Sequence, residues 1–328
     1  MPTANDPTLT SVLGPIICDL ICEKRGLGYH YNKEVRDFAR FDRFCVAIGH
    51  HDLALPRELV DAWTTKQAYE TEINRHFRIS LLRVLGRYMQ QCSYPAWVYP
   101  PQATSRSTST YVPYIFSKAE VAALLTAADA CQPDSNSPYR NLVLPVLFRV
   151  LYGTGLRIAE ALALQRSDLD LCNGTLHIRQ AKLDKERCIP IHPVLLEQME
   201  LYLGKLELIF GPEGPLFPGP TGVAYTADTI YRYFRRFLWQ ARIPHRGRGQ
   251  GPRVHDLRHV FAVHCLKKWV LDGVDLTVAL PYLSAYMGHV GLKSTQGYLR
   301  LTADLYPTIV MPVERHFGSI IPEGGGHQ

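Results

Sequence analysis

Several residues in the second half of the chain are of types that could together act on a phosphate group. Arg157 lies in the glycine-rich run Gly-Thr-Gly-Leu-Arg-Ile-Ala-Glu, and Arg258 follows His255 by three positions. His289 comes directly after a glycine, and Tyr298 follows it nine residues later. Planar guanidinium groups can hold two phosphate oxygens at once, a histidine can add a hydrogen bond, and a phenol can serve as the nucleophile. The set is therefore suited to chemistry on a phosphodiester.

Each of these residues also has an ordinary structural explanation. An arginine at a turn is more often an ion-pair partner, and a histidine and an arginine three apart on a helix can form a surface pair. A tyrosine at the start of a helix usually belongs to a core or an interface. Lys182, in the loop of a predicted hairpin, is by itself a solvated side chain, and Lys185 competes for any role assigned to it. The order and spacing of the whole set therefore matter more than any single member.

Together, this order and spacing closely resemble the tyrosine recombinase family, which includes the phage lambda integrase and the Xer proteins. The family pattern is an Arg in a T-G-L-R-x-x-E segment, a hairpin Lys, an H-x-L-R segment, a G-H pair, and a Tyr nine residues further on. The resemblance covers roughly residues 116–317. In this chain the pattern falls on Arg157, Lys182, His255, Arg258, His289 and Tyr298.

The resemblance implies that four of these residues surround the phosphate. Arg157 and Arg258 would hold its non-bridging oxygens, where negative charge builds up during attack, and His289 would add a further hydrogen bond. His255 would act either as a general base or as a positioned donor. The residue type alone does not separate those two roles.

The resemblance assigns the covalent step to the remaining two residues. Tyr298 would be the nucleophile and form a 3′-phosphotyrosine, while Lys182 would protonate the leaving 5′ oxygen. A free phenol has a pKa of about 10, so nearby cations must lower the cost of ionising it. Because the phosphotyrosine bond preserves the energy of the bond that was broken, neither a cofactor nor a metal ion is expected.

The expected function is site-specific recombination of double-stranded DNA, with two sites and four protomers in the working complex. The run Leu280–His289 resembles recombinases of mobile elements more than chromosome-dimer resolvases, which suggests integration or excision of such an element. Two alternatives stay open: DNA relaxation by a type IB topoisomerase-like enzyme, and a DNA-binding regulator with an inactive site. The presence of all six expected residue types favours an active enzyme.

The charge distribution also points to a phosphate-rich partner. The formal net charge is +6, a modest excess, but two stretches that lack acidic residues concentrate it. Since both stretches interleave arginine with aromatic residues, they favour contacts with the DNA backbone. The candidate DNA-binding residues are Arg75, Arg78, Arg83 and Arg87 in the first stretch, and Arg232, Arg235, Arg236, Arg246 and Arg248 in the second.

Composition along the chain predicts two domains. Residues 1–92 show apolar positions at helical spacing and predict a helical, DNA-binding, core-binding domain. Residues 93–114 are rich in proline, serine and threonine and predict an extended linker. Residues 115–328 predict the catalytic domain with a C-terminal tail. The predicted fold class is mainly α with a small antiparallel β-sheet, arranged as a two-domain DNA clamp.

Local signals within the second domain predict its elements. Ser117 and Glu120 form a capping box that starts a helix. Asn173-Gly174 between alternating apolar residues predicts a two-residue hairpin turn, and Pro190 suits the edge strand of a three-stranded sheet. Helices are expected over 138–151, 194–202, 227–242, 255–270 and 276–287, with a short one at 295–298.

The remaining features predict an intracellular protein. The eight cysteines form no CxxC pair, so free thiols in a reducing cytoplasm are the simplest interpretation. The N-terminus lacks the basic start of a signal peptide, and the apolar run Leu142–Leu151 is too short to span a bilayer. No membrane association and no zinc site are expected.

Overall fold

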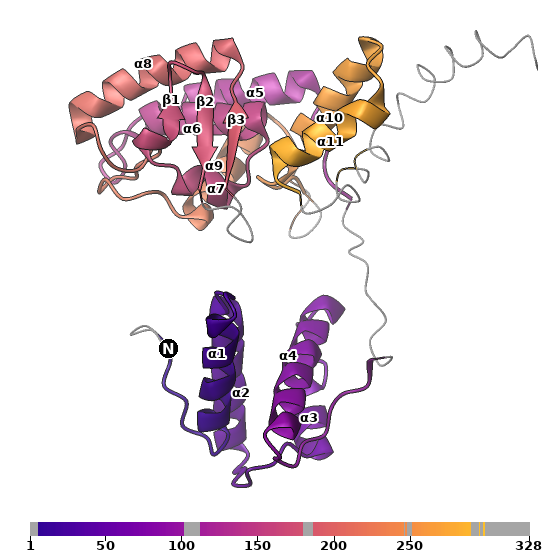
Figure 1. Ribbon diagram of the computed structural model, residues 1–328. Helices are drawn as coiled ribbons and strands as arrows, with labels where there is room; N and C mark the ends of the chain where they lie inside the picture. Colours follow the sequence, from indigo (N-terminus) through magenta and orange to yellow (C-terminus); the bar gives the residue numbers. More distant parts are fainter. Residues whose placement is uncertain are drawn as a thin grey trace, which may run out of the picture. The chain divides into compact units, whose positions relative to one another are not determined.

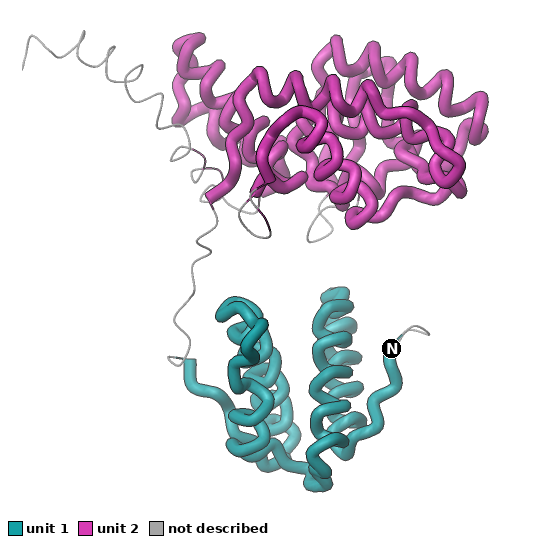
Figure 2. Tube along the Cα trace, turned by 180° about the vertical axis from the view of Figure 1, so that it is seen from behind, with its two compact units in different colours: residues 1–110 teal, residues 111–328 magenta. Residues whose placement is uncertain are grey.

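The chain folds into two compact units, residues 1–110 and 111–328 (Figure 2). The structure is a computed structural model that describes residues 6–101, 112–179, 186–245, 247, 251–289, 295 and 298. Each unit has its own hydrophobic core.

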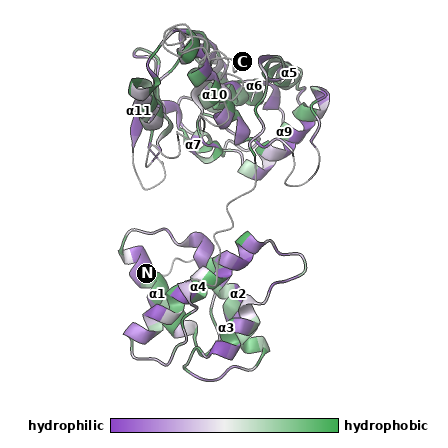
Figure 3. Cartoon of the chain, turned by 90° about the vertical axis from the view of Figure 1, so that its right-hand side faces the viewer, coloured by the Kyte–Doolittle hydropathy of each residue, from purple (hydrophilic) through white to green (hydrophobic). Residues whose placement is uncertain are grey.

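Unit 1 contains four helices, α1 (Gly14–Gly26), α2 (Asn32–Ala47), α3 (Arg57–Thr64) and α4 (Glu72–Gln91) (Figure 1). Pro56 is the N-cap of α3. The helices carry both hydrophobic and hydrophilic residues (Figure 3), and their apolar sides form one core around Phe38, Phe41, Leu82 and Leu85. Burial of such amphipathic faces is what holds short helices together.

The compact part of unit 1 extends beyond residue 92, where the sequence placed the start of a linker. The amide of Trp97 donates to the carbonyl of Leu55, and Tyr94, Trp97 and Tyr99 pack against the core. On the other side, Tyr114 packs against the core of unit 2. The proline content indicated an extended backbone, but the aromatic residues within that segment are large enough to attach it to a core.

Unit 2 is mainly helical, with a small sheet between its first and last helices (Figure 1). Helices α10 and α11 stand together at one end of this unit (Figure 1). Its elements are α5 (Lys118–Asp129), α6 (Arg140–Thr154), α7 (Ile158–Ala163), a 3-10 turn (Arg166–Asp168), β1 (Leu169–Asp170), β2 (Thr175–Ile178), β3 (Arg187–Pro190), α8 (Pro193–Phe210), α9 (Ala227–Gln240), α10 (Asp256–Leu271) and α11 (Leu276–Met287).

The sheet is three-stranded and antiparallel in the order β1-β2-β3, as predicted, with Pro190 on the edge strand. The predicted two-residue turn at Asn173-Gly174 is wrong. Asp170 pairs with Thr175, so four residues form the loop. The Asp170 carboxylate accepts hydrogen bonds from both the backbone and the side chain of Asn173, which stabilises this longer turn.

Most helix positions in unit 2 agree with the sequence. The capping box of Ser117 and Glu120 is present, and α11 has the predicted bounds. Helix α8 is longer than predicted and ends at Phe210 before Gly211, because Leu206 continues its buried face. None of the helices in the described residues is both long and apolar enough to cross a membrane.

The close approach of α6 and α10 depends on a glycine. Gly155 ends α6 with a φ of 60°, and a Cβ built there would lie 2.5 Å from a ring carbon of Phe261 on α10. The left-handed backbone and the contact both exclude a side chain. This packing places the first turn of α10 beside the end of α6.

We predict that Gly155→Ala destabilises the protein by roughly 2–4 kcal/mol, through the clash with Phe261 and the left-handed backbone. Urea unfolding would measure the loss. Gly204→Ala is the matched control, because Gly204 lies inside α8 with no atom close to its missing Cβ. That variant should gain about 0.5–1 kcal/mol. Equal stability of Gly155→Ala and the wild type would contradict the prediction.

Candidate active site

Arg258 is the most deeply placed charged residue of the site. It lies in the first turn of α10 with 2% of its surface exposed. One terminal nitrogen donates to the carbonyl of Gly155 at 2.6 Å, and the other to the carbonyl of Met287, also at 2.6 Å. Burial, and then the charge of Arg157, lower the pKa of Arg258 to about 10, so the side chain remains a cation at neutral pH.

Arg157 reaches the same place from a different element. It is the N-cap of α7, directly after the turn that Gly155 makes, and its Nη2 donates to the carbonyl of Gly288 at 3.3 Å. Its Nη1 pairs with the carboxylate of Glu160 at 2.6 Å. The T-G-L-R-x-x-E segment thus supplies both the arginine and the acid that holds it.

The C-terminus of α11 is the point on which the arginines converge. Three consecutive carbonyls, those of Tyr286, Met287 and Gly288, accept hydrogen bonds from Arg187, Arg258 and Arg157 respectively. The last carbonyls of a helix have no partner within the helix and carry partial negative charge, so cations are stabilised there. The end of this helix therefore fixes guanidinium groups from three distant segments.

Tyr298 is buried against this cluster, with 5% of its surface exposed. It packs on Leu266, Leu283 and Met287. Burial raises the pKa of its phenol above the usual value of 10, while Arg258 opposes that rise through its charge and a hydrogen bond. In this arrangement the phenol is protonated at neutral pH and lies beside a buried cation.

Two histidines contact the ring of Tyr298. The centroids of His259 and His289 lie 5.3 and 5.9 Å from it. His289 also forms a 2.7 Å hydrogen bond through Nδ1 with the hydroxyl of Thr295. Burial lowers the pKa of both histidines to about 4, with His255 next in importance for His259 and Arg258 for His289. Both rings are therefore neutral at pH 7.

The structure thus brings together Arg157, Arg258, His289 and Tyr298, which the sequence had selected. His255 is the N-cap of α10 and is exposed, with its ring centroid 4.9 Å from that of His259. Lys182 lies outside the described residues, and its role stays a prediction.

Sequence reasoning assigned no role to three residues of this cluster: Glu160, Arg187 and His259. Arg187 had a detectable signal. Residues alternate across a strand, so Arg187 shares the buried face of β3 with Ile189, and an arginine on a buried face needs an acidic partner. That partner is Glu160, which is 3% exposed.

Within the described residues, no group of three or more His, Cys, Asp or Glu side chains could hold a metal ion. The polar groups that meet at the end of α11 are instead arginines and histidines, with the buried carboxylate of Glu160 between two of the arginines. Such a set suits an anion better than a cation.

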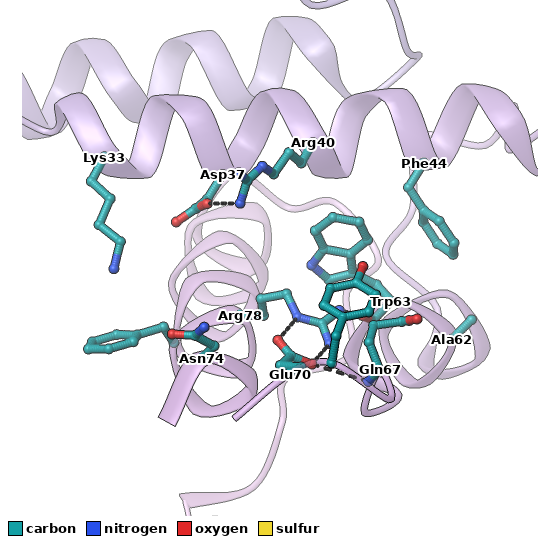
Figure 4. A pocket seen from close by; sticks show the side chains of 12 residues that line it. Lys33, Asp37, Arg40, Phe44, Ala62, Trp63, Gln67, Glu70, Asn74 and Arg78 are labelled. Carbon is teal, nitrogen blue, oxygen red and sulfur yellow. Dashed lines mark hydrogen bonds and ion pairs between the residues drawn. The ribbon is translucent and has the colours of Figure 1, made fainter. Parts of the chain in front are cut away.

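The first arginine run is used largely inside unit 1. Arg78 lines a surface groove of about 620 Å³, where it pairs with Glu70 and lies over the ring of Trp63 (Figure 4). Arg83 donates to the carbonyls of Tyr99 and Pro100. The stretch lacks acids in sequence, yet Glu70 just upstream folds back onto it. Arg75 likewise donates to a backbone carbonyl, whereas Arg87 is exposed.

The second run forms one face of α9. Arg232, Arg235 and Arg236 are exposed, and Trp239 beside them is 80% exposed. The buried residues of the helix are Ile230, Phe234, Phe237 and Leu238. Spacings of three and four residues place this group along one side of a helix. Arg246 and Arg248 lie outside the described residues.

Comparison with known proteins finds consistent relatives. Residues 114–304 match the Phage integrase family. The tyrosine recombinase XerD of Pseudomonas aeruginosa is 30% identical over 243 residues, which cover 73% of this chain and 74% of that protein. XerD of Pseudomonas putida is 29% identical over 91% of this chain and 94% of its own length. The crystal structure of the XerH site-specific recombinase, bound to a palindromic difH substrate in a post-cleavage complex, has a TM-score of 0.62 at 19% identity and covers 85% of this chain and 78% of that chain.

We predict that the protein loses stability as the pH falls from 6.5 towards 4. In the unfolded chain a histidine has a pKa of about 6.5, so it takes up protons in this range while His259 and His289 remain neutral in the folded protein. Because both rings are partly exposed, each contributes on the order of 1–2 kcal/mol. Urea unfolding at pH 7.5 and pH 4.5 would measure the free energy of unfolding. Its decrease at the lower pH should be smaller in His259→Gln and in His289→Gln than in the wild type. If both variants lost as much stability at pH 4.5 as the wild type, the two histidines would not be the cause.

Proposed function

The chain belongs to the phage integrase family, and from this premise we propose that it is a site-specific recombinase that cleaves DNA through Tyr298. The observation that carries the proposal is the convergence of Arg157 and Arg258 on adjacent carbonyls at the end of α11, beside the buried phenol. Two fixed cations and a nucleophile at one point are what attack on a phosphodiester requires.

The two arginines hold the scissile phosphate. Their guanidinium groups are fixed by backbone carbonyls and by Glu160, so little reorganisation is needed when negative charge develops on the phosphate oxygens. His289, neutral and oriented by Thr295, adds a hydrogen bond from its other ring nitrogen. His255, at the start of α10, acts as a base or a donor in this scheme.

The covalent step transfers the phosphate to the enzyme. The Tyr298 oxygen bonds to phosphorus as the bond to the 5′ oxygen breaks, which leaves a 3′-phosphotyrosine. Tyr298 loses one proton, and the 5′ oxygen gains one. The family resemblance assigns the protonation of the 5′ oxygen to Lys182. Attack by a 5′ hydroxyl then reverses these changes, so the cycle needs no nucleotide and no oxidant. Since Arg258 contacts Tyr298 of the same chain, we propose cleavage in cis.

The exposed arginines of α9 contact the DNA backbone, and both units contribute contacts to the duplex. In unit 1, Arg87 is available for backbone contacts, whereas Arg75, Arg78 and Arg83 stabilise the unit itself. Arginines on the backbone supply affinity, and base contacts supply the sequence preference.

The working complex contains four protomers on two DNA sites, and its biological role is the integration or excision of a mobile element. The residues of the run 280–289, which resemble those of mobile-element recombinases, support that role.

We predict that Tyr298→Phe abolishes the covalent adduct with DNA. The target site would first be selected from random-sequence duplexes by binding. A duplex of that site, nicked so that cleavage releases a short strand, should then give a denaturation-resistant adduct with the wild type. Tyr282→Phe, a tyrosine 72% exposed on α11, is the matched control and should retain the adduct. An adduct in Tyr298→Phe would overturn the assignment.

The same preparation separates the alternatives. Strand exchange between two site-bearing duplexes supports a recombinase. Relaxation of supercoiled DNA that lacks the site, without exchange, would instead support a topoisomerase. Selective binding without any adduct would support an inactive regulator.

We predict that alanine at Arg232, Arg235 and Arg236 weakens DNA binding and lowers its dependence on salt. Each lost phosphate contact should reduce the slope of log affinity against log salt by about 0.9. Fluorescence anisotropy between 50 and 200 mM salt, roughly the range over which such contacts weaken most visibly, would measure it. Lys205→Ala, an exposed lysine on α8, should leave the slope unchanged. An unaltered slope in the triple variant would place the DNA elsewhere.

A further inference from the structure

Arg187 connects the edge strand of the sheet to two other parts of unit 2. Its Nε donates to the carbonyl of Tyr286 at 3.0 Å, and its terminal nitrogens pair with the Glu160 carboxylate at 2.9 and 3.3 Å. Its side chain is 11% exposed. Bidentate pairing with a carboxylate is among the strongest interactions that an arginine forms.

Glu160 is shared between two arginines. The carboxylate that Arg187 grips also accepts from Nη1 of Arg157 at 2.6 Å and from the Arg157 amide at 3.0 Å. It is the nearest acid to Arg157 and is almost fully buried, so water does little to weaken its effect. The group of one carboxylate and two guanidiniums has a net charge of +1.

Removing Arg187 would change that balance. Glu160 and Arg157 would then form a pair without net charge, and the carboxylate would compete with a phosphate for the Arg157 nitrogens. Arg187 also packs against Gly288, whose carbonyl accepts the hydrogen bond from Arg157. A Cβ on Gly288 would lie 2.7 Å from Nη1 of Arg187. The two arginines therefore meet at one carboxylate and at one turn.

We propose that Arg187 is a positioning residue that neutralises Glu160 and thereby leaves the positive charge of Arg157 available to the scissile phosphate. This inference rests on the proposed function. Arg187 touches neither the phosphate nor Tyr298 in this scheme and acts only through Glu160. Its loss lowers the rate of strand cleavage at saturating DNA, without weakening DNA binding.

Single-turnover cleavage of the nicked duplex tests the proposal. Arg187→Met should cleave about 100-fold more slowly than the wild type, in line with the loss of one fixed donor. Its DNA affinity should stay within about threefold, because the backbone contacts that dominate affinity lie elsewhere. Arg187→Lys keeps the charge and should lose less than Arg187→Met. Arg179→Met is the matched control, since Arg179 follows β2 of the same sheet but pairs with buried Asp168 rather than with Glu160.

The second substitution distinguishes charge from structure. Adding Glu160→Gln to Arg187→Met removes the competing carboxylate and should restore cleavage at least tenfold over Arg187→Met alone, on the order of the charge effect that was lost. If Arg187 were only a packing residue, loss of its partner would damage the enzyme further. A slower double variant, or an Arg179→Met variant as slow as Arg187→Met, overturns the proposal.

A modified substrate tests the route of the effect. A sulfur in place of the 5′ bridging oxygen gives a leaving group that departs without a proton, so it bypasses the general acid. The Arg187→Met defect should persist on this substrate, whereas its disappearance would assign Arg187 to leaving-group protonation and refute the route through Arg157. If the wild type itself forms no adduct, the proposed function fails, and this inference with it. A wild-type adduct with equal cleavage by Arg187→Met removes the inference alone.

Discussion

The hydrogen bonds between arginine side chains and the last carbonyls of α11 are the interaction on which the site depends. Arginines from β3, from the N-cap of α7 and from α10 end on three successive peptide groups. Helix ends are the natural place for such groups, because their carbonyls lack helical partners and carry partial negative charge. A single helix terminus thereby determines the relative positions of arginine side chains as far apart in the sequence as Arg157 and Arg258.

Two glycine turns make that convergence possible. Gly155 lets α6 end against Phe261, and its carbonyl holds Arg258. Gly288 ends α11 with a φ of 64°, directly over Arg187. At both places a side chain would separate elements that have to touch. The electrostatics follow from this packing, since burial, and then the closeness of the arginines, lower the pKa values of Arg258 and His289.

Much of this arrangement could be predicted from residue types. The mainly helical fold with a small antiparallel sheet is confirmed, because helical periodicity, the capping box at Ser117 and the edge proline are local signals. The spacing of the polar residues also identified Arg157, Arg258, His289 and Tyr298 as candidates, and these lie together. The four-residue turn at Asn173 was missed, because an aspartate side chain outweighed the usual Asn-Gly preference.

Other features could not be predicted, because they depend on contacts distant in sequence. Peptide carbonyls are present at every position, so nothing in the residue types of α11 marks its end as the anchor for arginines. Nor could charge counting reveal that Glu70 neutralises Arg78, since the acid lies outside the run of arginines. The sharing of Glu160 by two arginines likewise requires β3 and α7 to be neighbours.

The use of main-chain oxygens as anchors affects how the protein can change over evolutionary time. A side-chain anchor disappears with one substitution, but a peptide carbonyl survives any replacement that preserves the local backbone. Tyr286 and Met287 therefore hold their arginines through the main chain, while their side chains serve in packing. The positions sensitive to substitution are instead the neighbouring glycines, where any side chain would separate the packed elements. A lineage of such proteins could diversify the exposed side of α9 while the centre retained its geometry.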